Sequence, residues 1–335
     1  MAPFKSSLAR SAGKLFGVFK EADLSLRGAT QNTRKITLPV QASGGTEITS
    51  GNNKYHVFLG SSEQNFSVTN GGTCEILVVA GGGSGGYFYG RGGGAGGVVH
   101  APDFPVEAGV TYKASAGNGA AAIPLSTGFG NNGNASYFKP SPAPAAPSAT
   151  NLYAMGGGGG GYSGDPTIPA PVIASTGSGG GTTPPGTYNP SFPSTTQHPT
   201  ANKYSNAGGL GGSSDVGGGG GGAGAAGSAY PDSSGGDGRP FSNFPAPVLA
   251  PAIPAPVRPT WSPAVGPTGL FGGGGAAYNA TSSVPDAPGG GGGYYYPTPA
   301  GDHNGVDYTG GGGAGPNPGP GAGGHGIVIV YYPTE

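Results

Sequence analysis

The sequence contains a single cysteine, Cys74, so no disulfide can form within the chain and stability has to come from packing or from assembly. Charged residues are also scarce: they occupy 9% of the 335 positions, against about 25% in typical globular domains. No run of 18 apolar residues occurs, which excludes a transmembrane helix, and we expect no secretory leader because residues 1–30 lack its apolar core.

The few charges are unevenly distributed. Seven of the fourteen basic residues lie in the first 35 positions, where only Glu21 and Asp23 are acidic, and the remaining 300 residues hold seven bases and thirteen acids. The sequence therefore indicates a separate basic segment, residues 1–35, followed by a mildly acidic body.

Residues 6–21 have apolar and basic positions at helical spacing. One face carries Leu8, Leu15, Phe16 and Phe19, and the opposite face carries Arg10 and Lys14. This pattern predicts a short amphipathic helix that Gly13 and Gly17 weaken by about 1 kcal/mol each. We interpret residues 1–35 as an attachment segment for a partner surface; packing on its own body and binding to a membrane surface are the alternatives.

Glycine is the residue that the chain has in excess, with 76 glycines and 35 prolines. Glycine tracts recur throughout the body; they include residues 81–83, 92–94, 156–161, 179–181, 217–222, 272–275, 289–293 and 310–313. Such a tract has no side chain to bury but still has backbone amides to satisfy. It can do so in polyproline-II geometry, an extended helix with three residues per turn whose amides bond sideways to neighbouring copies.

A flexible linker is the alternative interpretation, because this much glycine and proline is typical of disorder. The tracts, however, repeat and are bracketed by two apolar strands. Residues 75–80 form one strand, and residues 326–332, at the other end of the body, form its predicted partner. Shorter alternating strands are predicted at 55–58 and 66–68. We expect Cys74 to be buried in this sheet.

These patterns predict a mainly β and irregular fold: a short N-terminal helix, a small β-sheet base and a body of packed polyglycine-II-like helices with long loops. The expected divisions are the attachment segment 1–35, a connector 36–53 and the glycine-rich body 54–332, whose base is formed by 54–80 and 326–332. Long proline-rich loops are expected at 140–150, 182–206 and 239–268. Aromatic residues at loop tips are the candidates for surface contact: Tyr87, Phe88, Tyr89, Trp261, Tyr294, Tyr295 and Tyr296.

The motifs of common catalytic and binding chemistry do not assemble in the sequence. The one Gly-Lys pair, Gly13-Lys14, is followed by Leu15, where a phosphate-binding loop needs serine or threonine. The five histidines are scattered singly, without metal-ligand spacing; the densest polar cluster is Asp302, His303 and Asp307, for which a solvated loop is favoured over a weak ion site. We therefore expect no enzymatic activity, no cofactor, no metal and no nucleic-acid partner.

Three motifs in a fixed order resemble a known family. They are Tyr55–Phe58 leading into Cys74–Gly83, then Arg91–Val99, and finally Gly323–Tyr331. This order resembles the glycine-rich virion proteins of tailed bacteriophages over about residues 54–332. The long Pro-Ala-rich loops depart from the short connections usual in that family, so it is open how much of the chain forms one packed sandwich.

The resemblance implies a non-enzymatic virion protein at the capsid or tail surface. The segment from Leu8 to Arg34 resembles N-terminal segments that marine phages attach to several structural proteins, which implies that residues 1–35 bind other virion proteins. The body would contact a host glycan or outer-membrane protein as a tail-fibre adhesin, or would decorate the capsid, with a trimer as the expected oligomer. A glycine-rich scaffold or an ice-binding protein is the remote alternative, and an ice-binding protein would need a flat, regular face.

Overall fold

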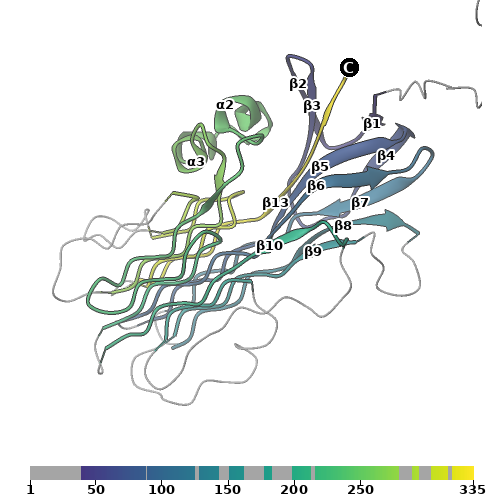
Figure 1. Cartoon of the computed structure of the whole chain (residues 1–335). Helices are drawn as coiled ribbons and strands as arrows, with labels where there is room; N and C mark the ends of the chain where they lie inside the picture. Colours follow the sequence, from purple (N-terminus) through teal and green to yellow (C-terminus); the bar gives the residue numbers. More distant parts are fainter. Residues whose placement is uncertain are drawn as a thin grey trace, which may run out of the picture. The chain divides into compact units, whose positions relative to one another are not determined.

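A computed structural model describes residues 39–87, 89–124, 128–142, 151–161, 177–182, 198–212, 216–278, 289–293, 303–315 and 319–335. The chain divides into two compact units, residues 1–38 and 39–335, and all the described residues belong to the second. The predicted N-terminal helix and its residues, Leu8 to Phe19, therefore lie outside the described part. Within that part the prediction of a mainly β and irregular fold is confirmed (Figure 1).

The larger sheet has six antiparallel strands in the order β10-β6-β5-β13-β3-β2. Its strands are β2 (Thr46–Ser50), β3 (Asn53–Phe58), β5 (Gly72–Val79), β6 (Val98–Val106), β10 (Asn202–Tyr204) and β13 (Ile327–Pro333). β5 and β13 are central and pair with Ile327 opposite Val79, which confirms the pairing predicted from their apolar sequences. Two strands separated by the whole glycine-rich insert thus close it at its base.

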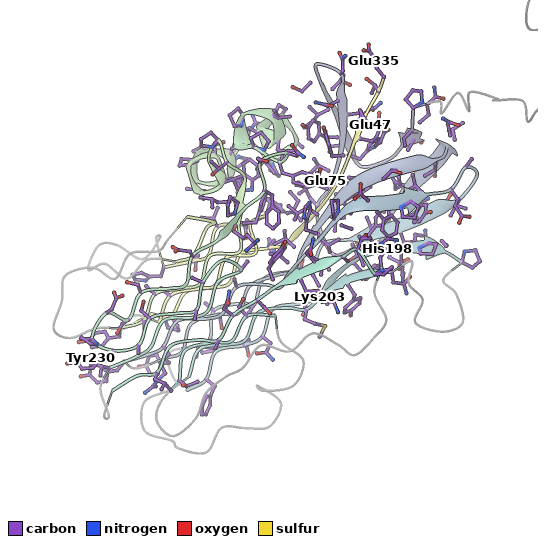
Figure 2. All side chains as sticks on the ribbon, in the orientation of Figure 1. Glu47, Glu75, His198, Lys203, Tyr230 and Glu335 are labelled. Atoms are coloured by element: carbon purple, nitrogen blue, oxygen red, sulfur yellow. The ribbon has the colours of Figure 1, made fainter. Side chains whose placement is uncertain are left out.

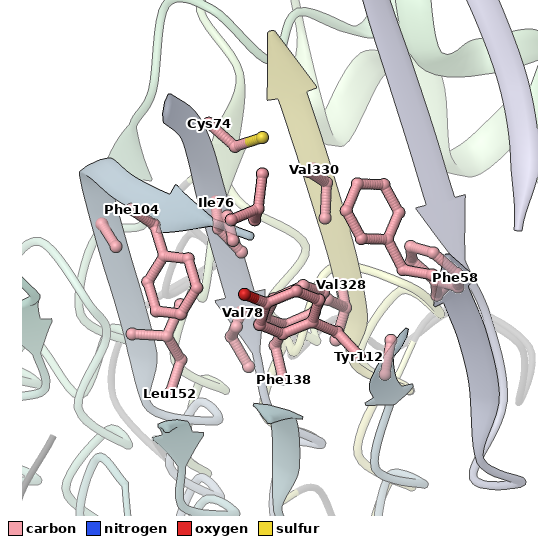
Figure 3. Close-up of a cluster of buried hydrophobic side chains, with 14 of the residues drawn as sticks. Phe58, Cys74, Ile76, Val78, Phe104, Tyr112, Phe138, Leu152, Val328 and Val330 are labelled. Carbon is pink, nitrogen blue, oxygen red and sulfur yellow. The ribbon is translucent and has the colours of Figure 1, made fainter. Parts of the chain in front are cut away.

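The second sheet has five antiparallel strands in the order β1-β4-β7-β8-β9 and faces the first across a hydrophobic core. Its strands are β1 (Gln41–Ser43), β4 (Gln64–Asn70), β7 (Thr111–Ser115), β8 (Ser136–Ser141) and β9 (Leu152–Ala154). Figure 3 shows Tyr112 and Phe138 beside Val78 and Val328 in this core. Cys74 is buried there, as expected.

A short helical segment covers the opposite face of the six-stranded sheet. It consists of α2 (Ala246–Leu249), the 3-10 helix η3 (Ala250–Ala252) and α3 (Arg258–Val265), and it is followed by β12 (Leu270–Phe271), which pairs with β11 (Arg239–Pro240). Apolar side chains of this segment pack on Leu77, Val79, Ile327 and Ile329. The central strands are thus buried on both faces, which explains their continuous apolar sequences.

The prediction of an irregular loop at 239–268 was wrong. Each of the three helices has a proline in its first turn, where the missing N–H has no intrahelical partner to lose. The repeated Pro-Ala-Pro pattern therefore permits short helices here. The base is also larger than predicted, because β1 and β2 lie in the segment 36–53 that was expected to be a connector.

Beyond the sheets the glycine tracts form a bundle of extended segments held together by their backbones. In residues 80–87, the amides of residues 80, 83 and 86 donate to carbonyls of residues 97, 94 and 91. Residues 81, 84 and 87 donate to residues 134, 131 and 128, and residues 82 and 85 donate to residues 324 and 321. Successive amides thus bond three different neighbours and return to the first after three residues, as polyproline-II geometry requires.

The same period holds in residues 91–97, near the middle of the bundle. Their amides donate in turn to segment 155–161, to segment 216–223 and to segment 310–315. The second of these neighbours runs parallel to 91–97 and the other two run antiparallel, since the partner numbers rise in one series and fall in the others. Residues 92–97 are absent from the set of positive-φ residues, which agrees with the left-handed form of this helix.

The close approach of these backbones explains the glycine tracts. A Cβ atom added to Gly82 would lie 2.0 Å from the Gly311 carbonyl oxygen, and one added to Gly92 would lie 1.8 Å from that of Gly275. Similar values recur along the tracts, so any side chain at these positions would displace a neighbouring backbone. Figure 1 shows the segments lying side by side beyond the strand ends.

Candidate contact surface at the far end of the glycine bundle

The far end of the bundle is the end at which segments leaving the sheets turn back. Residues 81–87 extend β5 away from the base, and residues 91–97 return to β6. The turn between them is closed by the Gly86 amide, which donates to the Arg91 carbonyl at 3.0 Å. Tyr89, in this turn, has a φ of 52°, a backbone conformation that non-glycine residues seldom adopt.

Tyrosines gather at this end from separate segments. The rings of Tyr89 and Tyr278 meet edge to face with their centroids 4.8 Å apart. Their backbones are joined as well, because the Tyr278 amide donates to the Gly90 carbonyl and the Tyr278 carbonyl accepts from Gly217. Tyr87 is half-buried and Tyr230 is 39% exposed. Figure 2 shows Tyr230 at the end of the bundle remote from Glu335 and the sheets.

Arg91 is fully buried beneath this surface. Glycines make room for its side chain: a Cβ added to Gly161 would lie 3.0 Å from its Cδ atom, and one added to Gly217 would lie 3.0 Å from its Cγ atom. A charged side chain is rarely enclosed so completely. Its alkyl part packs between the segments that contain Gly161 and Gly217, so Arg91 supports the surface from within.

Two of the residues predicted from the sequence for surface contact lie at this end of the bundle, and their contact with a partner stays a prediction. These are Tyr87 and Tyr89, whereas Phe88 and Tyr294, Tyr295 and Tyr296 lie outside the described residues. Sequence reasoning missed Tyr230, Tyr278 and Arg91. The available signal was their position: each tyrosine ends a glycine-rich segment, and Arg91 is the one charged residue in the run 90–97.

The prediction that Trp261 contacts a partner was wrong. Its side chain is fully buried under the helical segment, and its Nε1–H donates to the Tyr308 carbonyl at 3.1 Å. Tryptophan is large enough to bridge α3 and the glycine bundle, and a partner for its N–H permits full burial. It therefore belongs to the core.

Three histidines of the described part, His56, His100 and His325, join separate segments of the chain. His56 is fully buried; its Nδ1–H donates to the Gly44 carbonyl at 2.8 Å, and Tyr332 donates its hydroxyl to Nε2 at 2.8 Å. A carbonyl can only accept, so the proton is on Nδ1. Burial lowers the pKa of His56 below its ordinary value of 6.5, and burial raises the pKa of Tyr332 to about 12.

Two further histidines contact carboxylates. His100 Nε2 lies 2.8 Å from Glu75 Oε1, and Asn243 donates to the other oxygen of Glu75 at 2.7 Å, which joins the sheet to the segment before α2. His325 lies 3.7 Å from Asp307. Within the described ranges no three His, Cys, Asp or Glu side chains converge on a point that would suit a metal ion, and no helix is long and apolar enough to cross a membrane.

Comparison with known proteins assigns the chain to a family. A family model described as a glycine-rich domain matches residues 59–333. The chain belongs to this glycine-rich domain family. The matched range begins just after β3 and ends on β13, so it takes in the whole described bundle and every strand of the two large sheets except β1, β2 and β3. A search of curated proteins found no match.

Proposed function

We propose that this glycine-rich domain protein is a non-enzymatic structural component of a tailed-phage virion. In this proposal, residues 1–35 bind other virion proteins and the bundle carries an adhesive surface toward the host. The observation that carries the proposal is the tyrosine-lined far end, where Tyr89 and Tyr278 are fixed on segments that three backbone neighbours hold in place. Rigid aromatic side chains bind partner surfaces at low cost in conformational entropy.

The place where the described body begins supports an outward orientation of the tyrosine-lined end. The described body begins at Pro39 and continues into β1 in the sandwich, and Tyr230 lies at the other end of the bundle (Figure 2). The basic charge and the apolar residues of segment 1–35 suit attachment to an acidic or apolar virion partner. The chemistry of the far end suits a host glycan or the extracellular loops of an outer-membrane protein, since tyrosine offers a ring face and a hydroxyl.

The first experiment tests the adhesive surface. A Tyr89→Ser/Tyr278→Ser double variant should lose binding to host cells, measured with labelled protein by flow cytometry. Tyr153→Ser is the matched control, because Tyr153 is 36% exposed but lies on β9 in the sandwich. Equal melting temperatures would show that both variants fold. Undiminished binding by the double variant would contradict an adhesive role for this end.

The second experiment tests attachment to the particle. Removal of residues 1–28 leaves the described unit, 39–335, intact, so the truncated protein should be soluble but absent from purified particles. Quantitative mass spectrometry of particles made with the truncated gene measures this directly. Normal incorporation would contradict the role of the N-terminal segment.

Decoration of the capsid is the second candidate function. It is favoured by Leu210 and Tyr230, two large apolar side chains that are each 39% exposed on adjacent segments, where they suit contact with neighbouring subunits. Immuno-electron microscopy of intact particles separates the two candidates, since label on tail tips supports the adhesin and label over the capsid supports decoration.

A further inference from the structure

Three segments, residues 206–212, 225–230 and 233–238, lie at an edge of the described bundle. Segment 225–230 is joined to the first by the amides of Gly227 and Tyr230, which donate to the carbonyls of Ala207 and Leu210. It is joined to the third by the Ser228 amide. The amides of residues 225 and 228 therefore donate to segment 233–238, and those of residues 227 and 230 donate to segment 206–212.

The third side of this segment, which carries residues 226 and 229, faces outward. Neither the Ala226 amide nor the Ala229 amide donates to any described residue, and both alanines are exposed. The Ala226 and Gly227 carbonyls likewise accept no bond from the described part of the chain. Because the helix has three residues per turn, the two N–H groups lie on the same side, about 9 Å apart at about 3.1 Å per residue.

The flanking segments repeat the pattern. The amides of Ala207 and Leu210, and those of Ser234 and Asp237, are again three residues apart and again donate to no described residue. In each segment one intervening amide is bonded to the interior of the bundle: Gly209 donates to Gly219, and Gly236 donates to Gly220. The edge thus presents rows of backbone donors, as the edge of a β-sheet does.

The side chains along this edge are small or apolar. Among the described residues the exposed large hydrophobic side chains are Tyr153, Leu210 and Tyr230, and two of these three are here. The outward residues of the middle segment are alanines, and Asp237 supplies the one charge among the six outward positions. Long charged side chains, which usually protect an open edge from pairing, do not occupy these positions.

We propose that this edge is an interaction surface at which a second copy of the chain pairs through its backbone. The bundle itself shows that such segments pair in parallel and in antiparallel directions, so two identical edges can meet across a twofold axis. Alanine does not prevent this contact: Ala95 is fully buried in the bundle and still donates to the Gly221 carbonyl at 2.9 Å. This inference does not depend on the function proposed above.

Proline substitution tests the proposal, because proline suits polyproline-II geometry and removes only the N–H. An Ala226→Pro/Ala229→Pro variant removes two outward donors and no hydrogen bond within the described chain. Sedimentation velocity over a concentration series should show a dimer for the full-length protein. The variant should dimerise about 600-fold more weakly, because each copy loses two donors and a twofold dimer therefore loses four bonds, at roughly fivefold per lost bond.

Two cysteine variants provide a second test, which does not depend on whether the protein tolerates proline. Ala226→Cys should form a disulfide-linked dimer under mild oxidation, whereas Ala121→Cys, an exposed alanine elsewhere on the body, should not. Cys74 stays out of the reaction because it is buried. A monomer at every concentration, unchanged dimerisation of the proline variant, or equal cross-linking of the two cysteine variants would overturn the proposal.

Discussion

The substitution Gly220→Ala is the sharpest perturbation of the bundle. Gly220 lies in segment 216–223, where its amide donates to Gly275 and its carbonyl accepts from Gly236. An added Cβ would lie 1.9 Å from the carbonyl oxygen of Gly93, whereas ordinary contact begins near 3.4 Å. That carbonyl also accepts a hydrogen bond from Gly275 at 2.9 Å, so it cannot retreat without breaking a second contact.

The expected loss can be estimated from these contacts. Overpacking of a close-packed interior costs about 1–3 kcal/mol. Weakening of one or two backbone hydrogen bonds adds about 0.5–1.5 kcal/mol each. The reduced entropy of the unfolded chain offsets about 0.4–1 kcal/mol, because alanine is less flexible than glycine. The free energy of unfolding should therefore fall by about 3 kcal/mol.

Gly319→Ala is the matched control for this substitution. Gly319 has no atom within 4 Å of its added Cβ and no positive φ, so only the entropic gain applies and the free energy of unfolding should stay the same or rise slightly. Equilibrium denaturation in urea, followed by circular dichroism, measures both variants. Equal stability of Gly220→Ala and Gly319→Ala would refute the tight backbone packing.

Three further predictions concern the sandwich and its helical cover. Because burial depresses the pKa of His56 below 6.5, its contribution to the free energy of unfolding is complete above pH 6.5 and is lost as the pH falls through the folded-state pKa. Urea titrations at several pH values should therefore show that the free energy of unfolding depends less steeply on pH in His56→Gln than in the parent protein. An unchanged dependence on pH would count against a buried neutral imidazole. Burial raises the pKa of Cys74 to about 12, so a thiol reagent at pH 8 should label the native protein far more slowly than the urea-unfolded chain. Equal labelling rates of the native and unfolded protein would contradict the burial of Cys74. Trp261→Ala should lower the free energy of unfolding by about 3–5 kcal/mol, with Trp261→Phe losing less; a neutral Trp261→Ala result in denaturant titration would show that the helical segment is not part of the core.

Much of the sheet base could be predicted from sequence. The runs at 75–80 and 326–332 are apolar and rich in β-branched residues, and no other pair of strands of comparable strength was available to close the insert. The polyglycine-II packing was predictable for a similar reason, because a backbone without side chains has few ways to satisfy its amides.

Other features depend on long-range contacts that no local pattern reveals. β6 contains Pro102 and Pro105, and proline disfavours a strand prediction, yet β6 pairs with β5 along most of its length. The helices at 246–265 are short, and their stability comes from burial of Trp261 and Leu249 against the sheet rather than from helix propensity. The gathering of Tyr89 and Tyr278 likewise depends on the order in which the segments pack.

Scalar couplings across hydrogen bonds, measured by NMR on isotope-labelled protein, test the central claim most directly. The amides of Gly92, Gly93 and Gly94 should couple in turn to carbonyls of residues 218, 313 and 158, which belong to three different segments. Such a threefold series is specific to polyproline-II packing, since a β-strand bonds alternately to two neighbours. Alternation between two partners, or amides that exchange with solvent as fast as in an unfolded chain, would contradict the glycine bundle.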